Sequence, residues 1–196
     1  PSKESPTLQR IVSKGRYLLY GGSLLPGKGV ETVVKIAEQM PKVEFVIAGG
    51  DSNSIENLKK KSTSNVTFLG RVQYKDMMAL QFFAHILLLP IEAVVLTDSG
   101  RVNIGGWTSP LKMFEYMATG RPIISSDLPV LREILVDKHN ALLVRHDAVD
   151  QWVTAIEKIV VDSRLEKIIG ENAQKDLSAY YTWDKRALKI IRLCQE

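Results

Sequence analysis

The stretch of sequence that best indicates the fold is YLLYGGSLLPGKGVETVVKIAEQM, residues 17–40. It begins with a short apolar run, passes through a glycine-rich loop at 21–29 and ends in a segment whose apolar side chains recur at helical spacing. A strand, a glycine-rich turn and a helix in this order are typical of a parallel sheet with helical crossovers.

The same alternation continues along the rest of the chain. Apolar runs predict strands, and apolar residues at helical spacing predict helices between them and after the last. We therefore expect a doubly wound α/β fold, with a mostly parallel sheet and helices on both faces, in which ligands bind at the carboxyl ends of the strands. The six predicted strands are 17–21, 43–48, 66–69, 86–90, 122–125 and 141–144.

Length and composition fit one globular domain. The chain has 196 residues, of which 45% are hydrophobic and 24% charged. Residues 1–15 mix proline, serine and charge without periodicity, so we expect a linker there. The folded domain is expected over 16–180, and a C-terminal helix over 181–196.

The charge and cysteine content exclude several classes of protein. The net charge of +4 comes from 26 basic and 22 acidic residues spread along the chain, unlike the basic stripe of a nucleic-acid-binding protein. It is compatible with an anionic ligand or with peripheral contact to an anionic membrane. Cys194 is the only cysteine, no apolar run approaches the ~20 residues of a membrane span, and the start is unlike a signal peptide. We expect a cytoplasmic protein.

The glycine-rich loop is the first candidate site. It follows a strand and opens a helix, which is where backbone N–H groups and the helix dipole bind anions, and Lys28 adds a positive charge. The loop nearly matches the P-loop of nucleoside triphosphatases, but Gly29 stands where that motif has its magnesium-binding Ser or Thr. A glycine-rich turn with an exposed lysine is the simpler alternative.

A second candidate site lies at 108–118. Ser109 is expected to cap a helix with Pro110 in its first turn, so that the helix N-terminus and the hydroxyls of Thr108 and Ser109 face an anion. Lys112 and Glu115 lie three residues apart and share a face of this apolar helix. They form either an internal ion pair or a site in which Glu115 accepts hydrogen bonds from both hydroxyls of a ribose.

Residues 108–129, TSPLKMFEYMATGRPIISSDLP, resemble the donor-site signature of glycosyltransferase family 4, and the loop with Lys28 before Gly29 resembles that family in the same order. The resemblance covers the chain from Tyr17 to its end. It implies the Rossmann-like C-terminal half of a two-domain GT-B enzyme, whose missing N-terminal domain, joined through 1–15, holds the acceptor. Carried over, Glu115 binds the ribose and the backbone of Val72 contacts the base, while the diphosphate is bound by Gly22, Lys28, Thr108, Ser109 and the N–H of Leu111.

The implied reaction is transfer of a hexose from UDP-sugar or GDP-sugar to a glycan or glycolipid, with retention of the anomeric configuration. Lys28 is then the catalytic candidate, because it stabilises the charge that grows on the departing diphosphate. No metal or other cofactor is expected, and the three histidines, His85, His139 and His146, share no ligand spacing. Alone, this half is expected to bind the donor but to transfer sugar poorly.

The sequence departs from the family pattern at two positions. The family pairs its ribose glutamate with a second glutamate eight positions earlier, which contacts the sugar, but that position is Trp107 here. The sugar contact is therefore left to Asp98, Asn103 or the backbone of 105–106. The family also often has an arginine where Ser23 stands, which leaves Lys28 as the main cation.

Three other functions share parts of this pattern. A P-loop kinase or nucleoside triphosphatase would use the first loop with magnesium. A nucleotide-sugar epimerase of the same fold would use the same phosphate and ribose contacts. A non-catalytic module would bind the nucleotide sugar for a partner chain.

Overall fold

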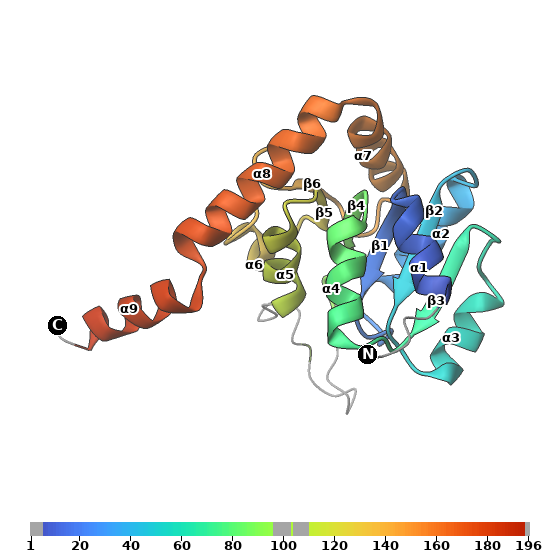
Figure 1. Ribbon diagram of the computed structural model, residues 1–196, viewed down its shortest axis with the longest axis horizontal. Coiled ribbons are helices and arrows are strands. Elements are labelled where there is room, and N and C mark those ends of the chain that lie inside the picture. Colours follow the sequence, from blue (N-terminus) through green and yellow to red (C-terminus); the bar gives the residue numbers. More distant parts are fainter. Residues whose placement is uncertain (1–5, 96–102, 104–109, 195–196) are drawn as a thin grey trace.

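A computed structural model describes residues 6–95, 103 and 110–194 of the chain (Figure 1). Within these residues the structure has six parallel strands in the order β3-β2-β1-β4-β5-β6. The ends of the six predicted strands are correct to within one residue. The strands are β1 (Tyr17–Gly21), β2 (Glu44–Ala48), β3 (Val66–Gly70), β4 (Ile86–Leu89), β5 (Ile123–Ser126) and β6 (Leu142–Val144).

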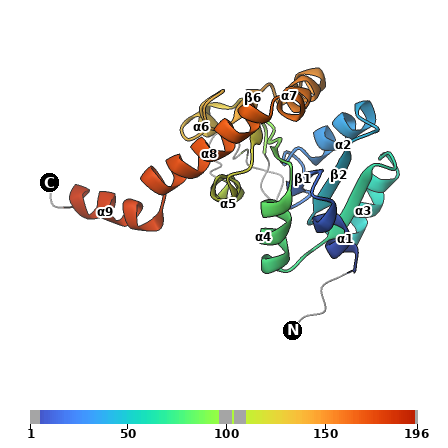
Figure 2. The same cartoon turned by 45° about the horizontal axis from the view of Figure 1, so that its top comes forward.

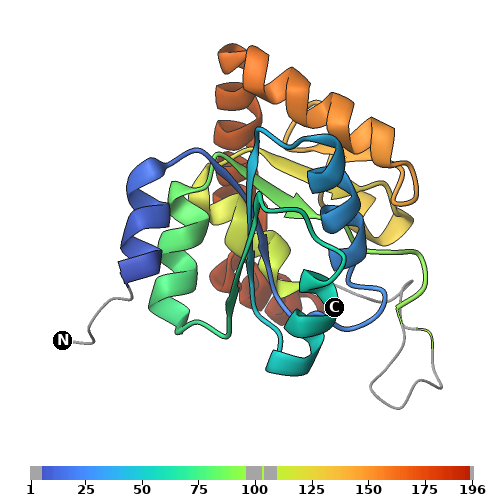
Figure 3. The ribbon, with the colours of Figure 1, turned by 90° about the vertical axis from the view of Figure 1, so that its right-hand side faces the viewer.

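Helices cover both faces of this sheet, as expected for a doubly wound fold. One face is covered by α1 (Pro6–Lys14), α4 (Tyr74–Phe83) and α5 (Leu111–Thr119), and the other by α2 (Val30–Gln39), α3 (Ser52–Lys59) and α7 (Val149–Val161). Figure 3 shows α1 and α4 on one side of the strands and α2 on the other. The short α6 (Pro129–Arg132) follows β5.

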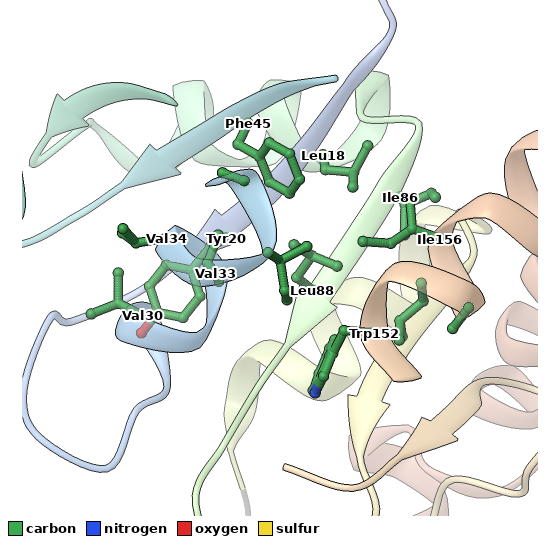
Figure 4. Packing of buried hydrophobic residues seen from close by; sticks show 14 of the residues in the cluster. Leu18, Tyr20, Val30, Val33, Val34, Phe45, Ile86, Leu88, Trp152 and Ile156 are labelled. Carbon is green, nitrogen blue, oxygen red and sulfur yellow. The ribbon is translucent and has the colours of Figure 1, made fainter. Parts of the chain in front are cut away.

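The core has two halves, one on each side of the sheet. Along β1, Tyr17 and Leu19 point into the half beneath α4 and α5, whereas Leu18 and Tyr20 point into the half beneath α2 and α7. Figure 4 shows the second half, where Trp152 of α7 and the valines of α2 surround these strand residues. Because both faces are buried, the strands are apolar on both sides and lack polar alternation.

The expectation of a linker over 1–15 is wrong for Pro6–Lys14, which form α1. Ile11 of this helix is 1% exposed and packs into the core near α4. The prolines, serines and charges led to the linker interpretation, although Leu8, Ile11 and Val12 stand at helical spacing.

The C-terminal helices run away from the sheet (Figures 1 and 2). The long helix α8 (Ser163–Tyr180) packs against α5 and α7. The last helix, α9 (Trp183–Leu193), was expected from the sequence; Thr182 caps it by accepting a hydrogen bond from the N–H of Lys185. None of the residues of α9 is buried. No helix in the described part of the chain is long and apolar enough to cross a membrane.

Candidate functional site

The strand order reverses direction between β1 and β4, the two neighbours at the centre of the sheet. The helix after β1 covers one face, and the helix that follows β4 covers the other. Doubly wound folds bind ligands at this switch point, outside the carboxyl ends of the strands. We call this region the crevice. The glycine-rich loop and the start of α5 both border it.

The glycine-rich loop is held tightly against the segment that follows β4. Gly29 is the N-cap of α2 in the left-handed conformation, with φ 79°, and a Cβ atom built on it would lie 1.5 Å from the carbonyl oxygen of Pro90. A Cβ built on Gly27 would lie 2.4 Å from the carbonyl oxygen of Val94. No side chain fits at 29, so the magnesium-binding hydroxyl of a P-loop has no place in this backbone. This geometry disfavours the kinase or nucleoside triphosphatase alternative.

Gly22 lies at the floor of the crevice between β2 and α5. Its N–H donates to the carbonyl oxygen of Ala48 at 2.9 Å, which continues the β1–β2 pairing past the end of the strand. A Cβ built on Gly49 would lie 1.9 Å from the carbonyl oxygen of Gly22, and one built on Gly22 would lie 3.2 Å from Nζ of Lys112. Because Gly22 and Gly49 have no side chains, the loops that follow β1 and β2 and the start of α5 can come into contact.

A hydrogen bond between backbone and side chain joins α5 to the end of β1. The fully buried Tyr116 accepts a hydrogen bond at its hydroxyl oxygen from the N–H of Gly21, at 2.9 Å. Burial raises the pKa of this hydroxyl above its usual value, so it stays neutral at physiological pH. The contact sets the distance between the N-terminus of α5 and the glycine-rich loop.

The N-terminus of α5 differs by one position from the expected helix start. Pro110 is the N-cap with an extended backbone and not a residue of the first turn, because the helix begins at Leu111. The side chain of Pro110 makes no capping hydrogen bond. In any α-helix the first N–H groups have no acceptor within the helix. The expected donors Thr108 and Ser109 lie outside the described residues. Leu111 is 69% exposed at the rim of the crevice.

Lys112 is the functional candidate that sequence reasoning missed. Its ammonium group lies 4.5 Å from the ring centroid of Tyr20, on the crevice side of α5. Burial lowers its pKa to about 7, and the nearby charge of Lys28 contributes to the lowering, while Glu115 opposes it. The amine of Lys112 thus lies beside the backbone of Gly22, and the charge of Lys28 acts on it. The available signal in the sequence was the pair of charged residues, Lys112 and Glu115, in a largely apolar helix.

Glu115 is not ion-paired to Lys112 among the described residues. Its Oε2 atom instead accepts a hydrogen bond from Nε2 of Gln81, at 3.2 Å, and the Gln81 side chain is buried on α4. The carboxylate lines a cavity of about 410 Å³ between α4 and α5, together with Tyr74, Met78 and Phe82. Gln81 orients one carboxylate oxygen, and the other has no hydrogen-bond partner in the described part of the chain.

A second cavity, of about 340 Å³, lies at the carboxyl ends of β1 and β2. Its lining is more polar than that of the first cavity. Arg71, in the turn after β3, lines this cavity together with Ser23, so a cation lies near the glycine-rich loop. Val72, the next residue, is partly buried against the core and precedes α4. The cavity is lined by Gly22, Ser23, Leu24, Leu25, Gly49, Gly50, Asp51, Ser54 and Arg71.

Comparisons with known proteins show which family the chain belongs to. Residues 3–176 match the family described as Glycosyl transferases group 1. The chain belongs to this family. It is 24% identical over 196 residues to the phosphatidyl-myo-inositol mannosyltransferase of Mycolicibacterium smegmatis, covering 97% of this chain and 47% of the relative. It spans less than half the length of the first curated relatives it matches.

Solved structures show that the fold of this chain occurs in other glycosyltransferases. The C-terminal domain of a glycosyl transferase group 1 family protein from Francisella tularensis aligns with a TM-score of 0.67 at 17% identity, over 93% of this chain and 95% of that domain. The Anabaena protein HepE in complex with UDP aligns with a TM-score of 0.78 at 17% identity, over 98% of this chain and 53% of HepE. This glycosyl transferases group 1 chain therefore has the Rossmann-like fold of one half of a GT-B enzyme.

The sugar contact of this group 1 chain stays a prediction. Asp98, residues 105–106 and Trp107 lie outside the described residues. Asn103 is described, and its Oδ1 atom accepts a hydrogen bond from the N–H of Val95, at 3.0 Å. That bond ties Asn103 to the segment that packs on Gly27.

The histidines lie away from the crevice. His85 contacts Glu166 at 3.4 Å and His139 contacts Asp176 at 3.1 Å, both on α8, while His146 is in the turn after β6. No cluster of three metal-ligating side chains occurs among the described residues.

Proposed function

We propose that this chain is the donor-binding half of a glycosyltransferase that transfers a hexose from a nucleoside diphosphate sugar. The observation that carries the proposal is the meeting of two anion-binding features at one crevice. The N-terminus of α5, which no side chain of the described residues caps, and the glycine-rich loop are held together by the Tyr116–Gly21 hydrogen bond. A helix N-terminus with free N–H groups binds phosphate, and two such elements suit a diphosphate.

The diphosphate in this proposal is held by the backbone of Gly22, the ammonium group of Lys28 and the N–H of Leu111. Thr108 and Ser109 would add hydroxyl donors from outside the described residues. Negative charge grows on the diphosphate as the bond to the anomeric carbon breaks. Donors that already point at this position stabilise the leaving group, so Lys28 is proposed to act in catalysis as well as in binding.

The nucleoside is proposed to lie between α4 and α5. Glu115 would accept hydrogen bonds from the ribose hydroxyls, because Gln81 occupies only one of its carboxylate oxygens. The backbone of Val72, at the turn before α4, would contact the base. Arg71 in the neighbouring cavity would supply positive charge near Ser23, the position at which the family resemblance implies an arginine.

Donor and acceptor classes are proposed from the relatives. HepE has been solved with UDP, and the mycolicibacterial relative is named a mannosyltransferase of phosphatidyl-myo-inositol. We propose a UDP-sugar or GDP-sugar donor and a glycan or glycolipid acceptor bound by a part of the enzyme outside this chain. Retention of configuration follows the family resemblance. Contact with a membrane surface would follow from a lipid acceptor.

A metal is not needed in the proposed mechanism. The lysine and the helix N–H groups would neutralise the leaving diphosphate, which is the role that a divalent cation has in other sugar transferases. Family membership favours transfer over the epimerase alternative, which would use the same binding contacts.

A thermal-shift panel tests the proposed function. The chain is heated with UDP, GDP, ADP and their sugars, because a ligand that binds only the folded state raises the melting temperature. We expect one base to stabilise the chain more than the other two, with its nucleotide sugar close behind. A melting temperature that none of these ligands changes would contradict the proposal.

A further inference from the structure

We propose that Lys112 binds the donor diphosphate together with Lys28, and that its amine takes up a proton as the diphosphate binds. The inference rests on the proposed function and adds a second cation to the same site. It differs from the sequence-based alternative, in which Lys112 serves only as an ion-pair partner of Glu115.

The position of Lys112 places its amine next to the proposed phosphate site. It is the second residue of α5, so its side chain starts next to the free N–H groups of the helix N-terminus. Its Nζ atom lies above the ring of Tyr20 and 3.2 Å from where a Cβ on Gly22 would be. A phosphate held by the backbone of Gly22 and the N-terminus of α5 would therefore lie beside this amine.

Among the described residues, no carboxylate forms an ion pair with Lys112. Tyr20 of β1 and Tyr116 of α5 are buried, and burial raises the pKa of each hydroxyl, so neither carries charge at neutral pH. The charge of Glu31 of α2 further raises the pKa of Tyr20. The positive charge of Lys28, in the glycine-rich loop, repels the ammonium group of Lys112. Glu115 attracts it, yet forms no ion pair with it in the described part of the chain.

The protonation state follows from this balance. Because burial and Lys28 outweigh Glu115, the pKa of Lys112 falls to about 7, and at pH 8 the free protein holds this amine mostly neutral. A bound diphosphate brings several negative charges to the amine, which favours the ammonium form. Binding at pH 8 therefore consumes one proton from solution, which ends on Nζ of Lys112. At pH 8 a nucleoside diphosphate is itself already deprotonated, so it releases no proton in exchange.

The arrangement suits a leaving-group site. Lys112 is partly buried, and an amine that is mostly neutral in the empty protein costs less there than a fixed charge shielded from water. Once protonated, it donates charge-assisted hydrogen bonds to phosphate oxygens. Lys28 and Lys112 would then approach the diphosphate from opposite walls of the crevice, one from the loop after β1 and one from α5.

Isothermal titration calorimetry of the chain tests this at pH 8. UDP, GDP and ADP are titrated in HEPES and in Tris, whose ionisation enthalpies differ, so that the difference in heat reports the protons taken up. We expect the wild-type chain to take up close to one proton for each nucleoside diphosphate bound. The free nucleoside should bind without uptake. This measurement uses the wild-type chain alone, so its result can be interpreted even if a substitution destabilises the fold.

Two variants locate the proton. Lys112→Met should abolish the uptake and weaken diphosphate binding about tenfold or more. Lys35→Met, the same substitution on the exposed side of α2, is the matched control and should behave as the wild type. Diphosphate binding without proton uptake, or with affinity unchanged in Lys112→Met, would overturn the role of Lys112 and leave the proposed function standing. Absence of nucleotide binding by both the wild type and Lys35→Met would instead contradict the proposed function itself.

Discussion

The hydroxyl oxygen of Tyr116 accepts a hydrogen bond from the N–H of Gly21 at 2.9 Å, and this contact sets the position of α5 against the glycine-rich loop. The two residues lie 95 positions apart in sequence. Both ends of the proposed diphosphate site depend on it, because Gly22 follows one partner and Lys112 precedes the other by one helical turn.

Tyr116→Phe should weaken both the fold and nucleotide binding. The substitution leaves the N–H of Gly21 buried without an acceptor, which costs about 1–3 kcal/mol of unfolding free energy. It also frees α5 to shift, so affinity for a nucleoside diphosphate should fall. Urea unfolding and calorimetry measure the two effects.

Tyr17→Phe is the matched control for this substitution. Its hydroxyl donates to the carbonyl oxygen of Leu80 at 2.7 Å, away from the crevice. The Tyr17→Phe substitution should lower the free energy of unfolding by about 1 kcal/mol and leave nucleotide affinity unchanged. Equal affinities for the two variants would show that the Tyr116 contact does not position the site.

Gly29→Ser should unfold the loop and not convert it into a P-loop. The added Cβ would meet the carbonyl oxygen of Pro90 at 1.5 Å in a left-handed backbone conformation. We expect a loss well above the ~1–2 kcal/mol of the conformational strain alone, and no magnesium-dependent ATP binding. Gly15→Ser is the control, because Gly15 has φ 63° and nothing within 4 Å of a built Cβ. Stabilities that match between the two variants would argue against the steric explanation.

Lys28→Ala should reduce affinity for a nucleoside diphosphate much more than affinity for the free nucleoside. The reason is that the proposed partner of Lys28 is phosphate charge, and a charge-assisted hydrogen bond contributes about 1.5–3 kcal/mol. Competition binding with UDP against uridine, or the matching pair for the preferred base, measures both. Losses of the same size for nucleotide and nucleoside would remove Lys28 from the diphosphate site.

Glu115→Gln should narrow the preference for ribose over 2′-deoxyribose. The amide keeps the shape and can still contact Gln81, but it loses the charge that strengthens hydrogen bonds from both ribose hydroxyls, so affinity for ribonucleotides should fall about tenfold. The measurement compares UDP with dUDP, or GDP with dGDP, on the variant and the wild type. A large loss of stability in the ligand-free protein, with an unchanged sugar preference, would mean that Glu115 has a structural role.

Much of the fold could be predicted from the sequence because its strands are short apolar runs between turn residues. The number of strands was correct among the described residues, and their ends were correct to within one residue. Helix α1 was not predicted, because the prolines, serines and charges of residues 1–15 were read as a linker although Leu8, Ile11 and Val12 stand at helical spacing. The start of α5 was placed one residue early because Ser109 and Pro110 fit the usual cap pattern, whereas the backbone of Pro110 is extended.

The candidate site was predicted less completely than the fold. Gly22, Lys28, Glu115 and Val72 were assigned from motifs and from the family resemblance, and their roles stay predictions. The structure shows that Gly22 lies beside Lys112 and that Val72 precedes α4. Lys112 could not be assigned, because helical spacing shows only that it shares a face with Glu115. Its direction toward Tyr20 and Gly22 depends on how α5 packs across the end of β1, which is a tertiary contact between distant segments.

The central claim is that this crevice binds a nucleoside diphosphate through protein groups alone. Calorimetry of the isolated chain with UDP, GDP and ADP in the presence of EDTA tests it most directly. The account predicts saturable binding of at least one of the three, at one site per chain, with no change when magnesium replaces EDTA. Binding that appears only with magnesium, or no binding of any of the three, would contradict it.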